Sequence, residues 1–198
     1  MTQTSTSAEE PSTTESDRFV IDGRSSRLTV RAFATGMLAA MGHNPTIGVR
    51  DLKGEVTFNP EKAEASSFRL VVKTSSLSVE DDISDKDRRE IERIMNQDVL
   101  QSAEFPEILY EAAGISISKM GDTLFSATLN GELTLHGIKR SEPIPARISL
   151  LGSMIRASGD FSLNQTDFNI KPVSVAGGAI KLKDEVKFTF EIVARRQE

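Results

Sequence analysis

The chain has 198 residues, a formal net charge of -5 and no cysteine. This length suits one β-barrel domain with a sizeable core. The missing cysteine excludes a disulfide, a thiolate metal site and a cysteine nucleophile. An acidic chain with charges of both signs is a poor fit to nucleic acid, so we expect no nucleic-acid partner.

The first part of the chain differs in composition from the rest. Residues 1–17 are rich in Ser, Thr and Glu and contain almost nothing to bury. Such a segment cannot offset its ordering entropy, so we expect a disordered tail at 1–17 and a domain at 18–198. The start lacks the features of a secretory signal, and no stretch approaches the roughly 18 apolar residues of a membrane span. We therefore expect a soluble, cytoplasmic protein without an integral membrane segment.

From Phe19 onwards, apolar residues alternate with polar ones, which is typical of half-buried strands. The clearest case is Val186, Phe188, Phe190 and Ile192. Alternation also occurs within residues 19–21, 28–32, 56–58, 68–72, 77–79, 108–110, 115–117, 125–135 and 144–150. Turn signals separate many of these segments, at residues 23–26, 59–60, 119–122, 130–131, 159–160 and 177–178.

One segment breaks the alternation. In residues 84–95, Ser84 and Asp87 have the spacing of a capping box, and Ile91, Ile94 and Met95 share one face at helical spacing. We expect a helix there, followed by a short turn at 97–100. Its many charged residues indicate a solvated face, with a docking surface as the alternative. Many short strands with one helix favour an up-and-down or meander β-barrel, although periodicity alone does not exclude a sandwich.

The two histidines, His43 and His136, each lie beside a glycine. Zinc requires three or four ligands, and no local spacing supplies them, so we expect no metal site. A histidine in a turn is most simply satisfied by backbone hydrogen bonds, and the alternative is a polar contact to a ligand head group. No nucleophile elbow and no nucleotide-binding glycine loop occurs, so we expect neither an enzyme nor a resident cofactor.

Residues 37–41, Met-Leu-Ala-Ala-Met, form an apolar stretch that does not alternate. The simpler interpretation is a helical turn packed as a lid on the barrel. The alternative is a methionine-containing portal through which an apolar ligand enters.

Several short motifs follow one another along the chain. They are the Phe19-Val-Ile-Asp22 start, the Gly42-His43-Asn44 turn, Gly54-Glu-Val-Thr-Phe58, the charged segment from Asp87 to Phe105-Pro106, Asn130-Gly131-Glu-Leu-Thr-Leu-His-Gly137, and Asp167-Phe168-Asn169-Ile170. In this order they resemble the motifs of the YceI-like, polyisoprenoid-binding proteins. The likeness runs from about Phe19 to Ala194. It departs from the family at Arg24, Gln165 and Asn169. The resemblance implies a mainly β fold, an extended lipocalin-like antiparallel β-barrel with one helix inserted near the middle. It also implies an isoprenoid or fatty chain held in the barrel.

We therefore expect binding, carriage or sequestration of a long apolar or amphiphilic small molecule in the barrel interior. The alternatives are an interaction module with a filled barrel and a cavity enzyme of unknown reaction. A second copy of the chain, in a homodimer, is also considered as a partner. The residues predicted to bind the ligand are Phe58, Leu70, Val72, Tyr110, Leu133, Leu135, Phe188 and Phe190 as wall residues, and His43 at the mouth.

Overall fold

The computed structural model describes residues 17–36, 44–59, 61–175 and 180–197. In chain order the strands are β1 (Asp17–Ile21), β2 (Arg27–Gly36), β3 (Thr46–Val49), β4 (Leu52–Phe58), β5 (Ser67–Lys73), β6 (Leu77–Val79), β7 (Glu107–Lys119), β8 (Leu124–Leu135), β9 (Ile138–Leu151), β10 (Met154–Asn164), β11 (Ser174–Val175) and β12 (Ile180–Arg196). The helical segments are η1 (Ala63–Ala65), η2 (Thr74–Ser76), α2 (Asp85–Ile94), the π-helical η3 (Met95–Val99) and η4 (Gln165–Phe168).

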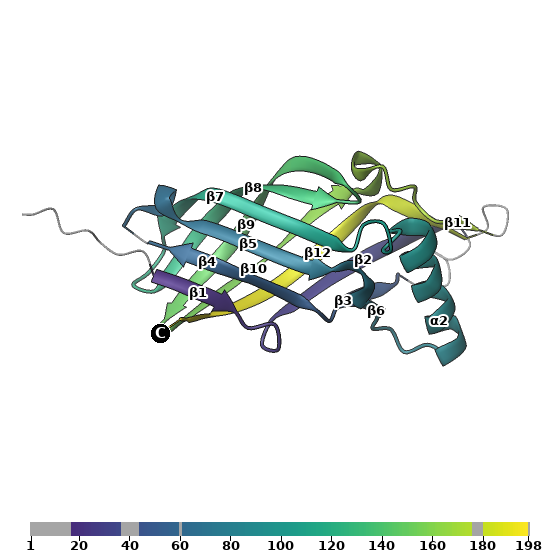
Figure 1. Cartoon of the computed structure of the whole chain (residues 1–198), viewed down its shortest axis with the longest axis horizontal. Helices are drawn as coiled ribbons and strands as arrows, with labels where there is room; N and C mark the ends of the chain where they lie inside the picture. Colours follow the sequence, from purple (N-terminus) through teal and green to yellow (C-terminus); the bar gives the residue numbers. More distant parts are fainter. Residues whose placement is uncertain (1–16, 37–43, 60, 176–179, 198) are drawn as a thin grey trace, which may run out of the picture.

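The strands form an antiparallel sheet that closes on itself as an eight-stranded barrel, as predicted (Figure 1). Neighbours follow the order β1-β4-β5-β7-β8-β9-β10-β12, and β12 closes the ring by pairing with β1. The long strands β7 to β10 and β12 alternate apolar and polar residues, so one face is buried inside the barrel. Closure leaves no free sheet edge around this part of the molecule.

Three neighbouring wall positions each consist of two strands in line. The first position is formed by β1 and β2, which both pair with β12. The next positions are formed by β4 with β3 and by β5 with β6, because β4 pairs with β5 and β3 pairs with β6. The breaks between them lie side by side. Lys73 N donates to Asp51 O at 3.0 Å, and Arg50 N donates to Ser76 O at 3.2 Å. Such irregularities bend strands.

A further irregularity lies between β9 and β10. These strands pair from Leu151↔Met154 to Arg147↔Ser158 and then diverge. Where the two strands diverge, η4 follows β10 directly, and its residue Phe168 is only 1% exposed. Arg140 of β9 donates to the backbone oxygen of Asp167 at 2.7 Å, which links η4 to β9. A short helix therefore completes the wall where the two strands diverge.

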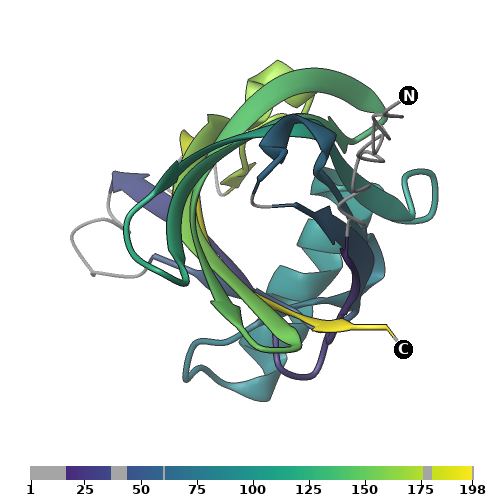
Figure 2. The same ribbon diagram turned by 90° about the vertical axis from the view of Figure 1, so that its left-hand side faces the viewer.

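The predicted helix is present as α2, with Ser84 as its N-cap. The Ser84 side chain accepts a hydrogen bond from Asp87 N at 3.1 Å, as the capping motif predicted. Two side chains of α2 bind the backbone of β6 and the loop after it. Glu92 accepts from Val79 N at 2.9 Å, and Arg88 donates to Asp81 O at 2.8 Å and to Val79 O. The helix thereby lies at one end of the barrel (Figure 2).

Two predicted turns are wrong. Residues 130–131 lie inside β8, and residues 159–160 lie inside β10. A Cβ on Gly131 would lie 2.6 Å from the Tyr110 hydroxyl, and one on Gly159 would lie 2.5 Å from Pro145 O. Both glycines therefore allow close approach within the barrel and do not reverse the chain.

The start of the domain also differs by one residue. Asp17, the last residue assigned to the tail, begins β1, and its carboxylate lies 2.6 Å from the Arg196 guanidinium. The other residues of the predicted tail lie outside the described residues.

Candidate functional site

The barrel interior is hollow at the end that carries α2 and η4. A cavity of about 2160 Å³ opens there. Its apolar wall includes Leu28, Val30, Val72, Ile108, Leu135 and Phe188, which come from five different strands. Typical small-molecule pockets measure about 300–1,000 Å³, so this cavity offers room for a much longer ligand.

The other end of the barrel is packed. Phe58 is 3% exposed, and its ring lies edge-on to Phe125 with centroids 5.9 Å apart. Tyr110 lies across Gly131, and its hydroxyl bonds to Leu129 O at 2.8 Å and to Glu142 O at 2.9 Å. Burial raises the pKa of the Tyr110 hydroxyl, so it stays protonated. The interior is therefore filled at one end and hollow at the other.

The helical segments contribute the outer part of the cavity wall. Ile94 of α2, Met95 and Val99 of η3, and Leu100 after it line the cavity. Their apolar side chains continue the lining supplied by the strands. The sequence showed the shared face of Ile91, Ile94 and Met95, but the many charges of the helix led us to favour a solvated face, with a docking surface as the alternative, and not a cavity wall. The apolar spacing was the signal that could have identified this wall.

The residues predicted to bind the ligand fall into two groups, those that line the cavity and those in the packed core. Val72, Leu135 and Phe188 line the cavity. The others do not line it: Phe58, Leu70, Tyr110, Leu133 and Phe190 belong to the apolar core or pack against it. His43, proposed for the mouth, lies outside the described residues, as does the apolar stretch 37–41. Contact of any of these residues with a ligand remains a prediction.

His136 lies in the turn between β8 and β9, with a left-handed backbone (φ 51°). Its Nε2 lies 3.0 Å from Gln101 Oε1, and its ring contacts Phe105 at a centroid distance of 4.4 Å. These contacts place it in a turn, without a position in the cavity wall. Within the described part of the chain, no three His, Cys, Asp or Glu residues cluster as metal ligands would.

Three charged groups lie where β9 diverges from β10. Burial raises the pKa of the Glu142 carboxyl, and the nearby carboxylate of Asp167 raises it further. Arg140 opposes this shift and lies 3.2 Å from the Asp167 carboxylate. These groups surround the point where η4 meets β9, so the local charge balance there depends on pH.

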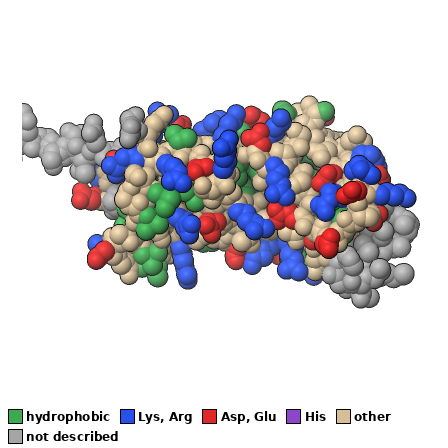
Figure 3. All heavy atoms as spheres, turned by 90° about the horizontal axis from the view of Figure 1, so that it is seen from below, with side chains coloured by type: hydrophobic (Ala, Val, Ile, Leu, Met, Phe, Trp, Pro, Cys, Tyr) green, Lys and Arg blue, Asp and Glu red, His purple; other side chains and the backbone are tan. Residues whose placement is uncertain are grey.

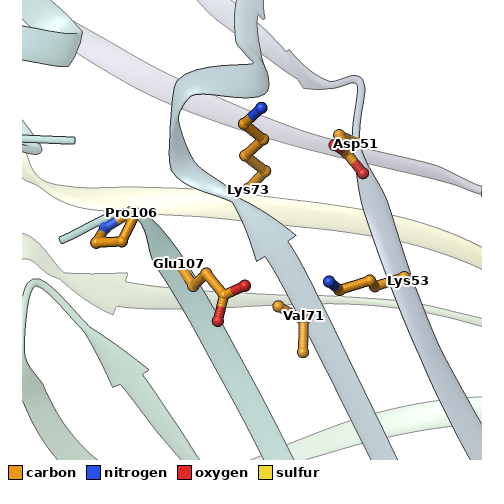
Figure 4. A pocket seen from close by; sticks show the side chains of 6 residues that line it. All are labelled: Asp51, Lys53, Val71, Lys73, Pro106 and Glu107. Carbon is orange, nitrogen blue, oxygen red and sulfur yellow. The ribbon is translucent and has the colours of Figure 1, made fainter. Parts of the chain in front are cut away.

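The outer wall carries charges of both signs, interspersed along the barrel (Figure 3). A small pocket of about 210 Å³ lies on this wall near β4 and β5. Figure 4 shows Lys53 and Glu107 extending toward Val71 from opposite sides. This pocket is about a tenth of the size of the barrel cavity and has no single charge character, so the barrel cavity is the stronger candidate site.

Fold and site together define an antiparallel β-barrel with an apolar cavity open at one end. The chain belongs to the YceI-like family, because the model of the YceI-like domain matches residues 19–194. A UPF0312 protein of Pseudomonas syringae pv. tomato is 28% identical over 172 residues, covering 83% of this chain and 82% of the relative. One from Pseudomonas savastanoi pv. phaseolicola is 29% identical and covers 71% of each chain.

Solved structures share the fold at low identity. Burkholderia cenocepacia BcnA has a TM-score of 0.67 at 18% identity, covering 87% of this chain and 98% of that chain. A polyisoprenoid binding domain from Saccharophagus degradans, implicated in plant cell wall breakdown, has a TM-score of 0.63 at 12% identity. That match covers 92% of this chain and all of the other. Among the described residues of the present chain, none of the helices has the length and apolar character needed to cross a bilayer.

Proposed function

We propose that this protein binds and carries or sequesters a long apolar or amphiphilic molecule, isoprenoid or fatty-acid-like, in the barrel cavity. The observation that supports this most directly is the apolar cavity of about 2160 Å³, open at one end of an otherwise packed barrel. The polyisoprenoid binding domain among the structural relatives agrees with the same ligand class.

Energetics favour a long ligand in such a cavity. Each buried methylene contributes roughly 0.8 kcal/mol, whereas association costs about 4–15 kcal/mol. A micromolar Kd corresponds to about 8.2 kcal/mol. Chain burial alone would then need about 15 to 30 methylene equivalents to reach that affinity. A short apolar molecule would bind weakly, and a long chain would bind with few polar contacts.

We propose binding without catalysis and without a resident cofactor. A completely filled barrel, the first alternative, does not fit the hollow end. A cavity enzyme would need titratable groups converging inside the barrel. The charged residues that line the cavity come mainly from α2, the loops and the ends of the strands. The cytoplasmic location and the homodimer remain predictions, to be tested by cell fractionation and by light scattering.

The first test is native mass spectrometry of the purified protein, followed by organic extraction. We expect co-purified lipid, or uptake of added long-chain probes such as hexadecanol or geranylgeraniol. A ligand-free protein that rejects both probes would overturn the proposal.

The second test places a charge on the cavity wall. Leu135→Arg should abolish probe binding, because an unpaired charge would lie where the apolar chain runs. Ser126→Arg is the matched control, because Ser126 is an exposed residue of the same strand. If Leu135→Arg does not fold, Val72→Lys provides a second wall variant. A folded wall variant with full affinity would show that the chain does not run along this wall.

A further inference from the structure

We infer that the bound molecule carries an anionic head group, a phosphate or carboxylate, which sits on a basic edge of the cavity mouth. This inference rests on the proposed function and specifies its ligand. The basic edge consists of Arg31 of β2, Lys171 after η4, and Lys181 and Lys183 of β12. All four residues line the cavity.

Strand pairing brings these cations to one edge. β12 pairs with β2 on one side, where Lys181 lies opposite Thr35. On its other side it pairs with β11, where Lys181 lies opposite Ser174. Leu182 N also donates to Val173 O at 3.0 Å, so the segment that begins near Lys171 runs along β12. Residues distant in sequence therefore converge beside the opening.

An irregularity in β12 fixes the position of Lys183. The register between β12 and β2 shifts between Leu182 and Val186, which leaves Lys183 in a bulge. The Gln165 side-chain amide donates to Lys183 O at 3.0 Å, so η4 holds the bulge in place. Bulges commonly redirect a side chain near a functional opening.

Two of the cations lie near the same aromatic ring. The Arg31 guanidinium lies 5.9 Å from the centroid of the Phe33 ring, and the Lys183 ammonium lies 6.0 Å from it. Such cation–π contacts orient the two side chains but leave their positive charges uncompensated. The two groups are therefore held in place and still available to an anion.

The basic edge has little internal compensation. Within the described residues, none of its four cations forms an ion pair. One carboxylate of the same edge, Asp184, lines the cavity, but both its oxygens accept from Thr166, at 2.9 and 2.5 Å.

The opposite side of the mouth is acidic, but most of its carboxylates already have partners. Glu90 and Asp98 pair with Arg93, Asp87 accepts from Ser84, and Asp81 accepts from Thr46 N. Only Glu90 and Asp98 of these carboxylates form an ion pair, so Asp81 and Asp87 keep their negative charge and repel an anion from this side of the mouth. The mouth is therefore divided by charge, and an anionic head group would lie on the side formed by β2 and β12.

The test compares four ligands that have different head groups and the same chain length. Hexadecanol, hexadecanoate, hexadecyl phosphate and hexadecyltrimethylammonium are titrated below their micelle concentrations, in competition with a fluorescent apolar probe. We expect both anions to bind at least about tenfold more tightly than the alcohol, a difference of about 1.4 kcal/mol. Added salt should reduce that advantage, because the mouth is exposed to solvent.

Charge reversal locates the effect. Lys181→Glu with Lys183→Glu should remove the preference for the anions over hexadecanol, measured as the ratio of their affinities for the same variant. The control is Lys53→Glu with Lys119→Glu, which makes the same change in net charge on the outer wall. Circular dichroism checks folding of both variants. Equal affinity for the alcohol and the anions, a preference for the ammonium, or an equal effect of the control would overturn the inference. Failure of every probe, the alcohol included, would instead overturn the proposed function.

Discussion

The division of the barrel into a packed and a hollow end predicts separate effects on stability and binding. Phe58→Ala removes a ring that is 3% exposed and packs edge-on against Phe125 at 5.9 Å. Removing a buried phenylalanine costs about 3–5 kcal/mol, since the apolar contacts are lost and a cavity remains. The aromatic pair contributes about 0.5–1.5 kcal/mol of this. For a domain of this size, the Tm should fall by about 6 to 20 °C.

Urea unfolding and thermal melts measure the loss, and probe titration measures the binding. Hexadecanol affinity of folded Phe58→Ala should stay within about twofold, because distant sites are additive to about 0.5 kcal/mol. Phe188→Ala is the comparison, since Phe188 lines the cavity and stacks on Phe161 at 4.7 Å. Phe188→Ala should lower the free energy of unfolding less than Phe58→Ala does, and it should weaken hexadecanol binding more. The division into a packed and a hollow end would be refuted if Phe58→Ala lost less than about 1 kcal/mol of unfolding free energy. It would also be refuted if the two variants showed equal changes in stability and in affinity.

Three further predictions concern single groups. Gly131→Ala should lower the Tm, because its Cβ would lie 2.6 Å from the Tyr110 hydroxyl, and an unchanged Tm would contradict this packing. The Asp22 pKa is lowered to about 2, mainly by the hydrogen bond from Ser25. This group therefore stabilises the fold above the pKa of the unfolded state, and the contribution is lost as the pH falls toward 2. Asp22→Asn should lower the Tm at pH 7 but not near pH 2. Burial raises the pKa of Glu142, so its neutral form favours folding at low pH and the benefit is lost as the pH rises through the raised pKa. Glu142→Gln should thus raise the Tm at pH 7 relative to the native chain, with the difference shrinking in acid; a difference independent of pH would exclude this titration.

The fold was predictable from the sequence because the local signals agree. Alternation over residues 186–192 marks a strand with one buried face, and Ser84 with Asp87 marks the start of the helix. The two wrong turns came from glycine, whose local signal is the same for a chain reversal and for close packing. Only the tertiary contact of Tyr110 with Gly131 distinguishes the two, and that contact joins different strands.

The candidate site was less predictable, because alternation identifies a buried face but gives no position along the barrel axis. Phe58 and Phe188 have the same pattern, yet Phe58 packs in the closed end and Phe188 lines the cavity. The basic edge was also missed. Lys171 and Lys181 are separated in sequence from Arg31, and only the pairing of β12 with β2 and β11 brings them together.

Backbone irregularities mark where the packed end changes into the hollow end. The loop at 22–26, the break at 50–51 and the turn η2 lie on three neighbouring wall positions. They lie close to one another, since a Cβ on Gly23 would lie 2.7 Å from Leu52 O, and Asp51 N donates to the Ser76 hydroxyl at 3.0 Å. Because such breaks bend strands, the wall beyond them can follow a different direction from the packed part. On another part of the wall, the ladder between β8 and β9 runs without a register shift from Leu124↔Ser149 to Leu135↔Ile138. Stability thus comes from a closed, filled section, while the section beyond the breaks can keep an apolar interior without side chains to fill it.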